Sequence, residues 1–378
     1  MKFACYTQDL LDDLKNVAKC ADPKPMTPPI LSAVKITADD ERKRLVLEAT
    51  NFKVAAQAVI PANIEVGGTV CVNARYLLEV VGKLTDDVVT FTLEGNSLRV
   101  DCGGSKFNLL TFDAKEFPTP KFAEEPELNV RAATLKDMIS KTIFAVEKTD
   151  NSRPVFKGVN FQAKRADNGY VFQAYATNTH RIACYLGGRI SANDSNVDGF
   201  NVVIPPDFLR MINAAIDNNP DNFIYIIPED QKVTFKFDNV RYSTRIIEGE
   251  FPPVDRLLYD DNRTNTATFY TKELKAALEQ AKLVAKNAEY NQVILRLSEN
   301  KIEVTADSRD HGNFSKNVEA KCSAELEISF NVDYLLDFLG AAACTKIRMK
   351  YGDNVTPIEM SDIDIPDEYI YIVTPVRI

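Results

Sequence analysis

The chain has 378 residues, of which 45% are hydrophobic and 26% charged, and its formal net charge is −9. This composition is typical of a globular protein with two or three domains. It excludes a helical membrane protein, because no apolar run approaches the roughly 20 residues that a membrane helix needs. The acidic balance argues against an evenly basic surface. It does not exclude a nucleic-acid partner, because binding depends on where the cations lie.

The cysteines indicate the compartment. There are seven, an odd number, without CxxC spacing, and most of them stand in apolar contexts. This pattern is typical of reduced, buried thiols and gives little support to a zinc site. The first 13 residues include three acids and no apolar signal core, which argues against a secretory signal. We therefore expect a cytoplasmic protein without a metal or cofactor.

A strand that runs into an amphipathic helix is predicted at three places, residues 3–19, 128–144 and 267–283. Each segment has apolar residues four positions apart at the same place in its helix, which is one apolar helix face. These pairs are Leu10 and Leu14, Leu135 and Ile139, and Leu274 and Leu278.

A second strand–helix unit follows each of these, at residues 70–84, 202–216 and 328–342. Asn73, Pro205 or Asn331 stands before or at the helix start, where caps and first-turn prolines are favoured. Alternating segments with turn residues between them, such as residues 223–237, predict β-hairpins around these helices.

The tripeptide Glu-Phe-Pro occurs at residues 116–118 and 250–252, each time after an alternating strand-like run. Proline ends a strand and stiffens the exit from it. The final residues, 371–378, align with these two closing strands. The sequence therefore predicts three tandem α+β domains, each with two helices and several antiparallel strands. The predicted domains are residues 1–121, 122–254 and 255–378, called copies one, two and three below.

With this repeat, the segments ATNTHRIACY, GEFPPVDRLL and YIVTPVRI resemble the bacterial DNA polymerase III β subunit, the sliding clamp. The resemblance covers the whole chain. It implies three DNA-clamp domains that close as a head-to-tail dimeric ring around duplex DNA, with helices facing the DNA. Such a ring is a processivity factor without a catalytic centre, which tethers the replicative polymerase.

The most specific segment is His180-Arg181, which follows Ala-Thr-Asn in copy two only. On its residues alone it indicates a surface turn with a satisfied histidine. The resemblance instead implies a pocket for short peptides of the DNA polymerase III α subunit, the clamp loader and other proteins with a clamp-binding motif. The implied pocket residues are Phe156, Thr177, His180, Arg181, Ile182, Pro252, Arg256, Leu257, Thr356, Val373, Thr374, Pro375, Val376, Arg377 and Ile378.

The family commonly has methionine where this chain has Thr374 and Val376. Because methionine makes an adaptable pocket floor, this chain is expected to accept narrower or different peptides.

The resemblance also implies DNA contacts and a dimer interface. The implied DNA contacts are Lys24, Lys141, Arg153, Lys282 and Lys286. Each lysine alone is equally explained by a solvated mixed-charge face. At the interface, Lys106 and Phe107 would meet Leu283 and Val284 of the other subunit, with ordinary core packing as the alternative for the apolar residues.

An enzyme is a weaker interpretation. The chain has only two histidines, His180 and His311, and no P-loop, GxGxxG or GxSxG motif. Two alternatives remain open, a metal-dependent nuclease that acts on DNA and a scaffold that does not bind DNA. Metal-dependent cleavage would identify the first, and failure of circular DNA to retain the protein would identify the second.

Overall fold

The computed structural model describes residues 1–23, 29–123, 128–149, 153–166, 169–192, 199–217, 219, 221–286 and 291–377. These residues divide into two compact units. Unit 1 comprises Met1–Ala132, Ala192–Val197 and Arg210–Ile246, and unit 2 comprises Ala133–Ser191, Asp198–Leu209 and Ile247–Ile378. Across the described ranges, no helix is long and apolar enough to cross a membrane.

Unit 1 contains copy one together with the first strand and the last strands of copy two. Its elements are β1 (Lys2–Tyr6), α1 (Thr7–Ala18), η1 (Pro29–Ser32), β2 (Ala33–Asp39), β3 (Arg44–Thr50), β4 (Val54–Pro61), β5 (Asn63–Val66), β6 (Gly68–Asn73), α2 (Ala74–Val81), β7 (Val88–Glu94), β8 (Ser97–Cys102), β9 (Ser105–Phe112), η2 (Ala114–Glu116), β10 (Leu128–Arg131), β15 (Phe223–Pro228), β16 (Lys232–Phe237) and β17 (Val240–Arg245).

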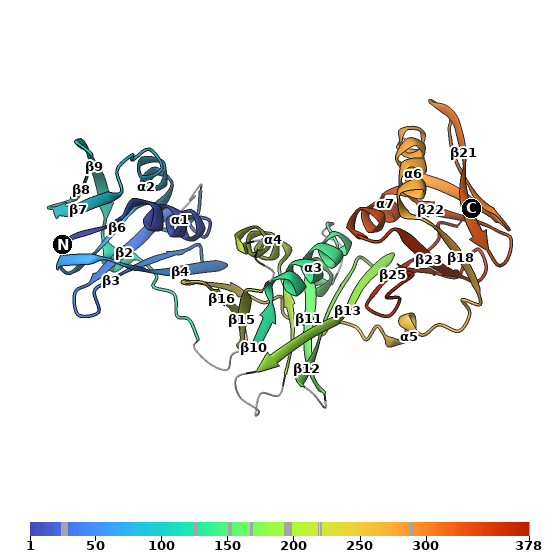
Figure 1. Cartoon of the computed structure of the whole chain (residues 1–378), viewed down its shortest axis with the longest axis horizontal. Helices are drawn as coiled ribbons and strands as arrows, with labels where there is room; N and C mark the ends of the chain where they lie inside the picture. The colour runs from blue at the N-terminus through green and yellow to red at the C-terminus, as the bar shows by residue number, and fades with distance from the viewer. Residues whose placement is uncertain are drawn as a thin grey trace. The chain divides into compact units, whose positions relative to one another are not determined.

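The strands of unit 1 are linked in one antiparallel series, β5-β1-β7-β8-β9-β6-β2-β3-β4-β17-β16-β15-β10. Helices α1 and α2 lie side by side, with α1 against β3 and β4 and α2 against β2 and β6 (Figure 1). The pairing of β4 with β17 joins copy one to copy two within one sheet.

Unit 2 contains the rest of copy two and copy three. Its elements are α3 (Ala132–Thr142), η3 (Ile143–Ala145), η4 (Pro154–Lys157), β11 (Val159–Ala166), β12 (Gly169–Thr177), β13 (Arg181–Ala192), β14 (Phe200–Ile204), α5 (Asp255–Leu258), β18 (Asn265–Tyr270), α6 (Thr271–Ala285), β19 (Gln292–Ser298), β20 (Lys301–Ser308), β21 (Gly312–Cys322), β22 (Leu326–Asn331), α7 (Val332–Ala341), β23 (Lys346–Tyr351), β24 (Ile358–Asp362) and β25 (Tyr369–Val373). Helix α4 (Pro206–Ala215) spans the division between the units.

The strands of unit 2 are linked in one antiparallel series, β14-β11-β12-β13-β25-β24-β23-β18-β21-β20-β19-β22. Here β13 of copy two pairs with β25 of copy three, as β4 pairs with β17 in unit 1. Helices α6 and α7 lie side by side in copy three (Figure 1). Each junction between copies is therefore bridged by hydrogen-bonded strands.

The apolar periodicity and the capping residues of the sequence account for the helices. Leu10 and Leu14 of α1 are fully buried, and burial of one such side chain contributes about 2–3 kcal/mol. Asn73 caps α2 by accepting a hydrogen bond from the backbone N of Tyr76 at 2.9 Å. The predicted fold class of three α+β copies with antiparallel sheets is confirmed.

The Glu-Phe-Pro segments have a structural role beyond ending a strand. Phe117 is buried against Ile30 and Leu31 of copy one. Phe251 is buried with Phe156 of copy two, and their rings meet edge to face at 6.2 Å. Each phenylalanine therefore anchors the linker to the copy that the chain is leaving, and the adjacent proline stiffens the exit.

Candidate functional site

The His180-Arg181 segment forms a tight turn between β12 and β13. The hydroxyl of Thr177 donates to the carbonyl of Arg181 at 2.7 Å. Asn178 Oδ1 accepts from the backbone N of His180 at 3.2 Å and of Arg181 at 3.1 Å. Thr179 adopts a left-handed φ of 74°. The Thr and Asn side chains thus fix the turn, which leaves His180 exposed and directs Arg181 inward.

The C-terminal segment lies against this turn. The backbone N and the hydroxyl of Thr374 both donate to the carbonyl of His180 at 2.9 Å. The backbone N of Val376 donates to the carbonyl of Ser329 in β22 at 2.8 Å. These bonds hold the C-terminal segment between the turn of copy two and the core of copy three.

A cavity of about 320 Å³ opens at this place. It brings together the exposed histidine of the turn, the C-terminal segment and the start of α7. The lining residues are His180, Asn331, Tyr334, Thr374, Pro375, Val376 and Arg377. Of the predicted pocket residues, Ile378 lies outside the described part of the chain.

Asn331 and Tyr334 are lining residues that the sequence analysis did not predict. Asn331 caps α7 by accepting from the backbone N of Asp333 at 2.9 Å. The sequence signal at these positions was structural, a helix cap and an aromatic residue in the first turn. Only the folded chain shows that the start of α7 borders the cavity.

Arg181 lies beneath the cavity and is 5% exposed. Its Nη1 donates to Asp337 Oδ2 at 2.7 Å, and its Nη2 donates to the carbonyl of Phe144 at 2.6 Å. The guanidinium also lies over the ring of Tyr334, 4.4 Å from its centroid. Two of its donor groups are therefore used within the protein, and the arginine supports the cavity by holding Tyr334 and α7.

The other predicted pocket residues form an apolar cluster beside the linker between copies two and three. Phe156 and Ile182 are buried together with Phe251, and Leu258 of α5 completes the cluster. Leu257, next to it, is 45% exposed. The buried residues form an apolar cluster, and the partly exposed Leu257 lies beside it.

The segment that carries α5 is held by a buried ion network. Arg263 Nη1 donates to Glu359 Oε2 at 2.9 Å, and Arg263 Nη2 donates to the carbonyl of Leu257. Glu359 also pairs with Lys350 at 2.7 Å. Arg263 and Glu359, which the sequence analysis did not single out, thereby fix the backbone beside the candidate site.

Three predicted pocket residues contribute less directly. Pro252 lines a separate cavity of about 240 Å³ with Tyr175 and Phe251. The hydroxyl of Thr356 donates to Asp353 at 2.7 Å, so this side chain stabilises the turn between residues 353 and 356. The exposed side chain of Arg256, on α5, adds a cation to this side of the cluster.

The predicted DNA-contact residues differ in whether an ion pair neutralises their charge. Lys141 pairs with Asp137 at 3.0 Å and lies over the rings of Tyr185 and Tyr369. Lys282 pairs with Asp333 at 2.7 Å, and this hydrogen bond raises the pKa of the lysine.

Arg153 and Lys286 are exposed, and no ion pair involves them within the described residues. Lys24 lies outside the described ranges. Among the described residues, cationic charge without an ion pair is therefore found at Arg153 and Lys286 rather than at Lys141.

The predicted dimer residues lie on two separate surfaces. Lys106 is exposed and Phe107 half-buried on β9, which pairs with β8 along residues 105–110. On α6, Leu283 is 76% exposed and Val284 is half-buried. Core packing therefore does not explain Leu283. A further exposed leucine on β9, Leu110, is 84% exposed and was missed by the sequence analysis.

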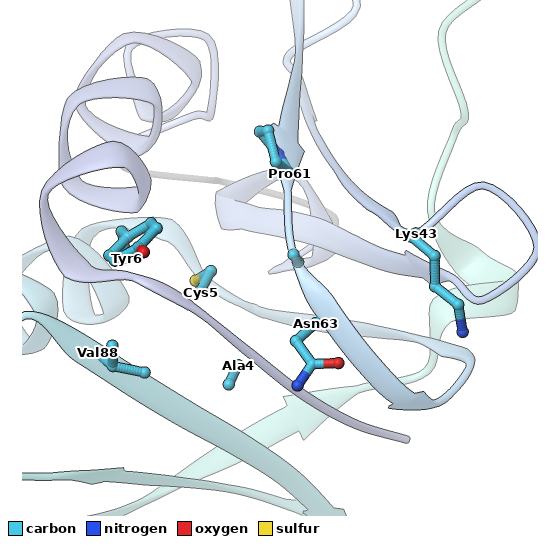
Figure 2. Close-up of a pocket in the computed structure, with 8 residues that line it drawn as sticks. Ala4, Cys5, Tyr6, Lys43, Pro61, Asn63 and Val88 are labelled. Atoms are coloured by element: carbon cyan, nitrogen blue, oxygen red, sulfur yellow. The ribbon is translucent and has the colours of Figure 1, made fainter.

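Another cavity, of about 440 Å³, lies in copy one and contains none of the predicted site residues. Figure 2 shows Cys5, Tyr6 and Val88 on one side of it and Lys43 on the far side. Burial, with Asp9 nearby, raises the pKa of the Cys5 thiol to about 12. The thiol is therefore protonated and unreactive at neutral pH.

Within the described residues, no group of three or more His, Cys, Asp or Glu side chains could hold a metal ion. Three tandem α+β copies that pair strands across each junction are the architecture of the DNA-clamp class. Residues 1–121 match the N-terminal domain of the DNA polymerase III beta subunit, residues 129–253 its central domain and residues 257–377 its C-terminal domain. The chain belongs to the DNA polymerase III β subunit family.

Individual relatives match along their whole length. The beta sliding clamps of Halalkalibacterium halodurans and Bacillus subtilis are each 28% identical to this chain, with 100% of both chains covered. The crystal structure of the DNA polymerase sliding clamp from Bacillus subtilis has a TM-score of 0.90 at 26% identity and covers 100% of this chain and 99% of that one. The DNA polymerase III subunit beta from Pseudomonas aeruginosa, at 23% identity and a TM-score of 0.91 with 100% of both chains covered, shares the fold.

Proposed function

We propose that this chain is a sliding clamp, which encircles duplex DNA and tethers the replicative polymerase and other partners for processive synthesis. The observation that carries the proposal is the match of all three domains of the family, in order, along nearly the whole chain. The full-length similarity to proteins named beta sliding clamp supports it further. In this role the chain is a cytoplasmic replication protein and acts without a catalytic centre of its own.

The proposed ring is a head-to-tail homodimer. The exposed side chains on β9 of copy one and at the end of α6 in copy three support an interface between two chains. Leu283 and Leu110 are largely exposed apolar residues, and an interface between two chains would remove them from water. We propose that Phe107 and Lys106 of one subunit meet Leu283 and Val284 of the other.

DNA is held without sequence preference. A ring that slides needs phosphate contacts that are few and weak, and phosphate contacts carry no sequence information. The exposed cations Arg153 and Lys286 suit this role, since neither has an ion pair within the described residues. The net charge of −9 also disfavours tight non-specific binding to open DNA.

Partner proteins are proposed to dock at the cavity beside His180. Apolar walls with a few polar groups suit a linear peptide with aliphatic or aromatic anchors. The hydroxyl of Thr374 is directed to the carbonyl of His180, so this position offers a short, fixed wall to the cavity. We expect this wall to narrow the range of accepted anchors relative to a methionine at the same position.

The proposal is tested by retention on DNA. The intact protein, loaded onto nicked circular DNA by its cognate clamp loader, is expected to remain bound through a gel-filtration step at moderate salt. Cutting the circle with a restriction enzyme should release it, because only topology holds a closed ring. Tight, sequence-specific binding to a short linear duplex would contradict the proposal. Metal-dependent cleavage of the circle would favour a nuclease instead.

A further inference from the structure

The junction between copies one and two repeats the turn that borders the cavity at the junction between copies two and three. Between β3 and β4, the hydroxyl of Thr50 donates to the carbonyl of Val54 at 2.9 Å. Asn51 Oδ1 accepts from the backbone N of Lys53 and of Val54, each at 3.0 Å. Phe52 adopts a left-handed φ of 68°. The Thr-Asn pair therefore builds the same turn twice.

The strand that passes this turn is equivalent too. The backbone N of Arg245, at the end of β17, donates to the carbonyl of Lys53 at 3.1 Å. The backbone N of Thr374, just after β25, donates to the carbonyl of His180 at 2.9 Å. Lys53 thus occupies the place of His180, and Arg245 occupies the place of Thr374.

A cavity of about 240 Å³ lies at this first junction, within unit 1. Among the described residues, its lining has four cations and no carboxylate. The cations are Lys53, Lys121, Lys232 and Arg245. In a chain whose net charge is −9, this lining is a local excess of positive charge.

Within the described part of the chain, three of these cations are available to a ligand. Lys232 is already used, because it pairs with Glu229 at 3.1 Å and donates to the carbonyl of Lys121 at 2.5 Å. The side chains of Lys53, Lys121 and Arg245 are exposed and have no ion pair within the described residues. A carboxylate ligand would therefore find unneutralised partners here.

The same cavity offers an aromatic contact. Phe52 lines it and is 55% exposed, in a left-handed backbone conformation that bulky residues rarely adopt. Pro118 and Pro120 of the linker form another part of the wall. These three side chains form a rigid apolar surface beside the cations.

We propose that the first junction is a second docking site, which binds an acidic linear peptide with an aromatic or aliphatic anchor. The anchor packs on Phe52 and the linker prolines, and the carboxylates pair with Lys53, Lys121 and Arg245. A peptide fits better than single-stranded nucleic acid, because the cavity admits one or two side chains and is not an extended groove for successive nucleotides. This site goes beyond the proposed function, which assigns partner docking to the second junction only.

The test measures binding of a fluorescein-labelled peptide, Asp-Glu-Phe-Asp-Leu, to the full chain by fluorescence anisotropy. Binding is expected to weaken as salt is raised, because exposed charges are screened. The double variant Lys53→Glu, Arg245→Glu should bind roughly tenfold more weakly or worse, since each reversal replaces attraction by repulsion. The matched control Lys83→Glu, Lys301→Glu changes the net charge equally at exposed positions away from the cavity and should keep the wild-type affinity.

A second variant keeps the test decisive if the double variant does not fold. Phe52→Gly removes the aromatic contact and relieves the left-handed backbone, so it should weaken peptide binding without lowering the thermal midpoint. Deletion of residues 374–378 removes the wall of the other cavity and should leave this binding unchanged.

Four results would overturn the proposal. The first is equal loss of binding in the control variant, and the second is loss in the deletion but not in Lys53→Glu, Arg245→Glu. The third is a labelled oligothymidylate that binds through Lys53 and Arg245 when the peptide does not. Absence of measurable peptide binding at low salt would also overturn it.

Discussion

A variant at Arg181 tests whether this residue supports the cavity or contacts a partner peptide directly. The variant Arg181→Met keeps an unbranched side chain but removes the hydrogen bonds to Asp337 and to the carbonyl of Phe144. A buried acceptor that loses its partner costs about 1–3 kcal/mol. The lost cation–π contact with Tyr334, 4.4 Å from the ring centroid, adds about 1–2 kcal/mol.

Loss of the ion pair between Arg181 and Asp337 costs less stability than loss of a fully buried pair. The side chain of Asp337 is 38% exposed, so water can solvate it once the arginine is gone. We therefore expect copy three and its junction with copy two to lose about 3 kcal/mol of stability in total. Urea unfolding followed by intrinsic tyrosine fluorescence measures this loss as a lower midpoint.

The matched control is His180→Ala, on the neighbouring residue, whose side chain is exposed at the cavity. It should weaken binding of a clamp-binding-motif peptide, measured by calorimetry, with little change in the urea midpoint. Arg181→Met should lower the midpoint and weaken peptide binding only through displacement of Tyr334. A wild-type midpoint together with lost peptide binding would mean that Arg181 contacts the peptide directly.

Three further outcomes are expected. Phe107→Ala should weaken the dimer by about 2–4 kcal/mol, as expected for an aromatic at an interface hot spot, whereas Tyr259→Ala, at a 77% exposed residue, should not. Analytical ultracentrifugation measures this, and an undiminished dimer at low concentration would refute the interface. Deleting residues 374–378 should abolish binding of a motif peptide in calorimetry while leaving the dimer mass intact, and equal affinity in both proteins would place the peptide elsewhere. Burial and, less strongly, neighbouring acids raise the pKa of Asp13 to about 6. The stability from this group is therefore fully present below its unfolded pKa and lost as pH rises through 6, so Asp13→Asn should raise the thermal midpoint more at pH 8 than at about pH 4.5. The same change in midpoint at both pH values would show that Asp13 does not titrate in this range.

The sequence by itself determined the repeated architecture. The i, i+4 pairs such as Leu10 and Leu14 set one buried face for each helix, and Asn73 fixed a helix start through its own side chain. The two Glu-Phe-Pro segments marked the junctions between copies. These features depend on residues that are close in the chain, and local periodicity and capping are therefore sufficient to predict them.

Tertiary structure decided what the site residues do. Arg181 and His180 are adjacent in the chain, but one is buried against Asp337 and the other is exposed at the cavity. Lys141, expected at the DNA, pairs with Asp137 and lies over Tyr185 and Tyr369, from strands that the sequence could not pair.

Tertiary structure also decided which residues line the two cavities at the junctions between copies. Tyr334 borders the cavity only because β25 pairs with β13 and carries the C-terminal segment across α7. The basic cavity of the first junction likewise depends on the pairing of β17 with β4. Sequence periodicity determines which side of an element is buried, but its neighbours are determined by long-range strand pairing, and those neighbours decide whether a charge is used internally or left for a partner.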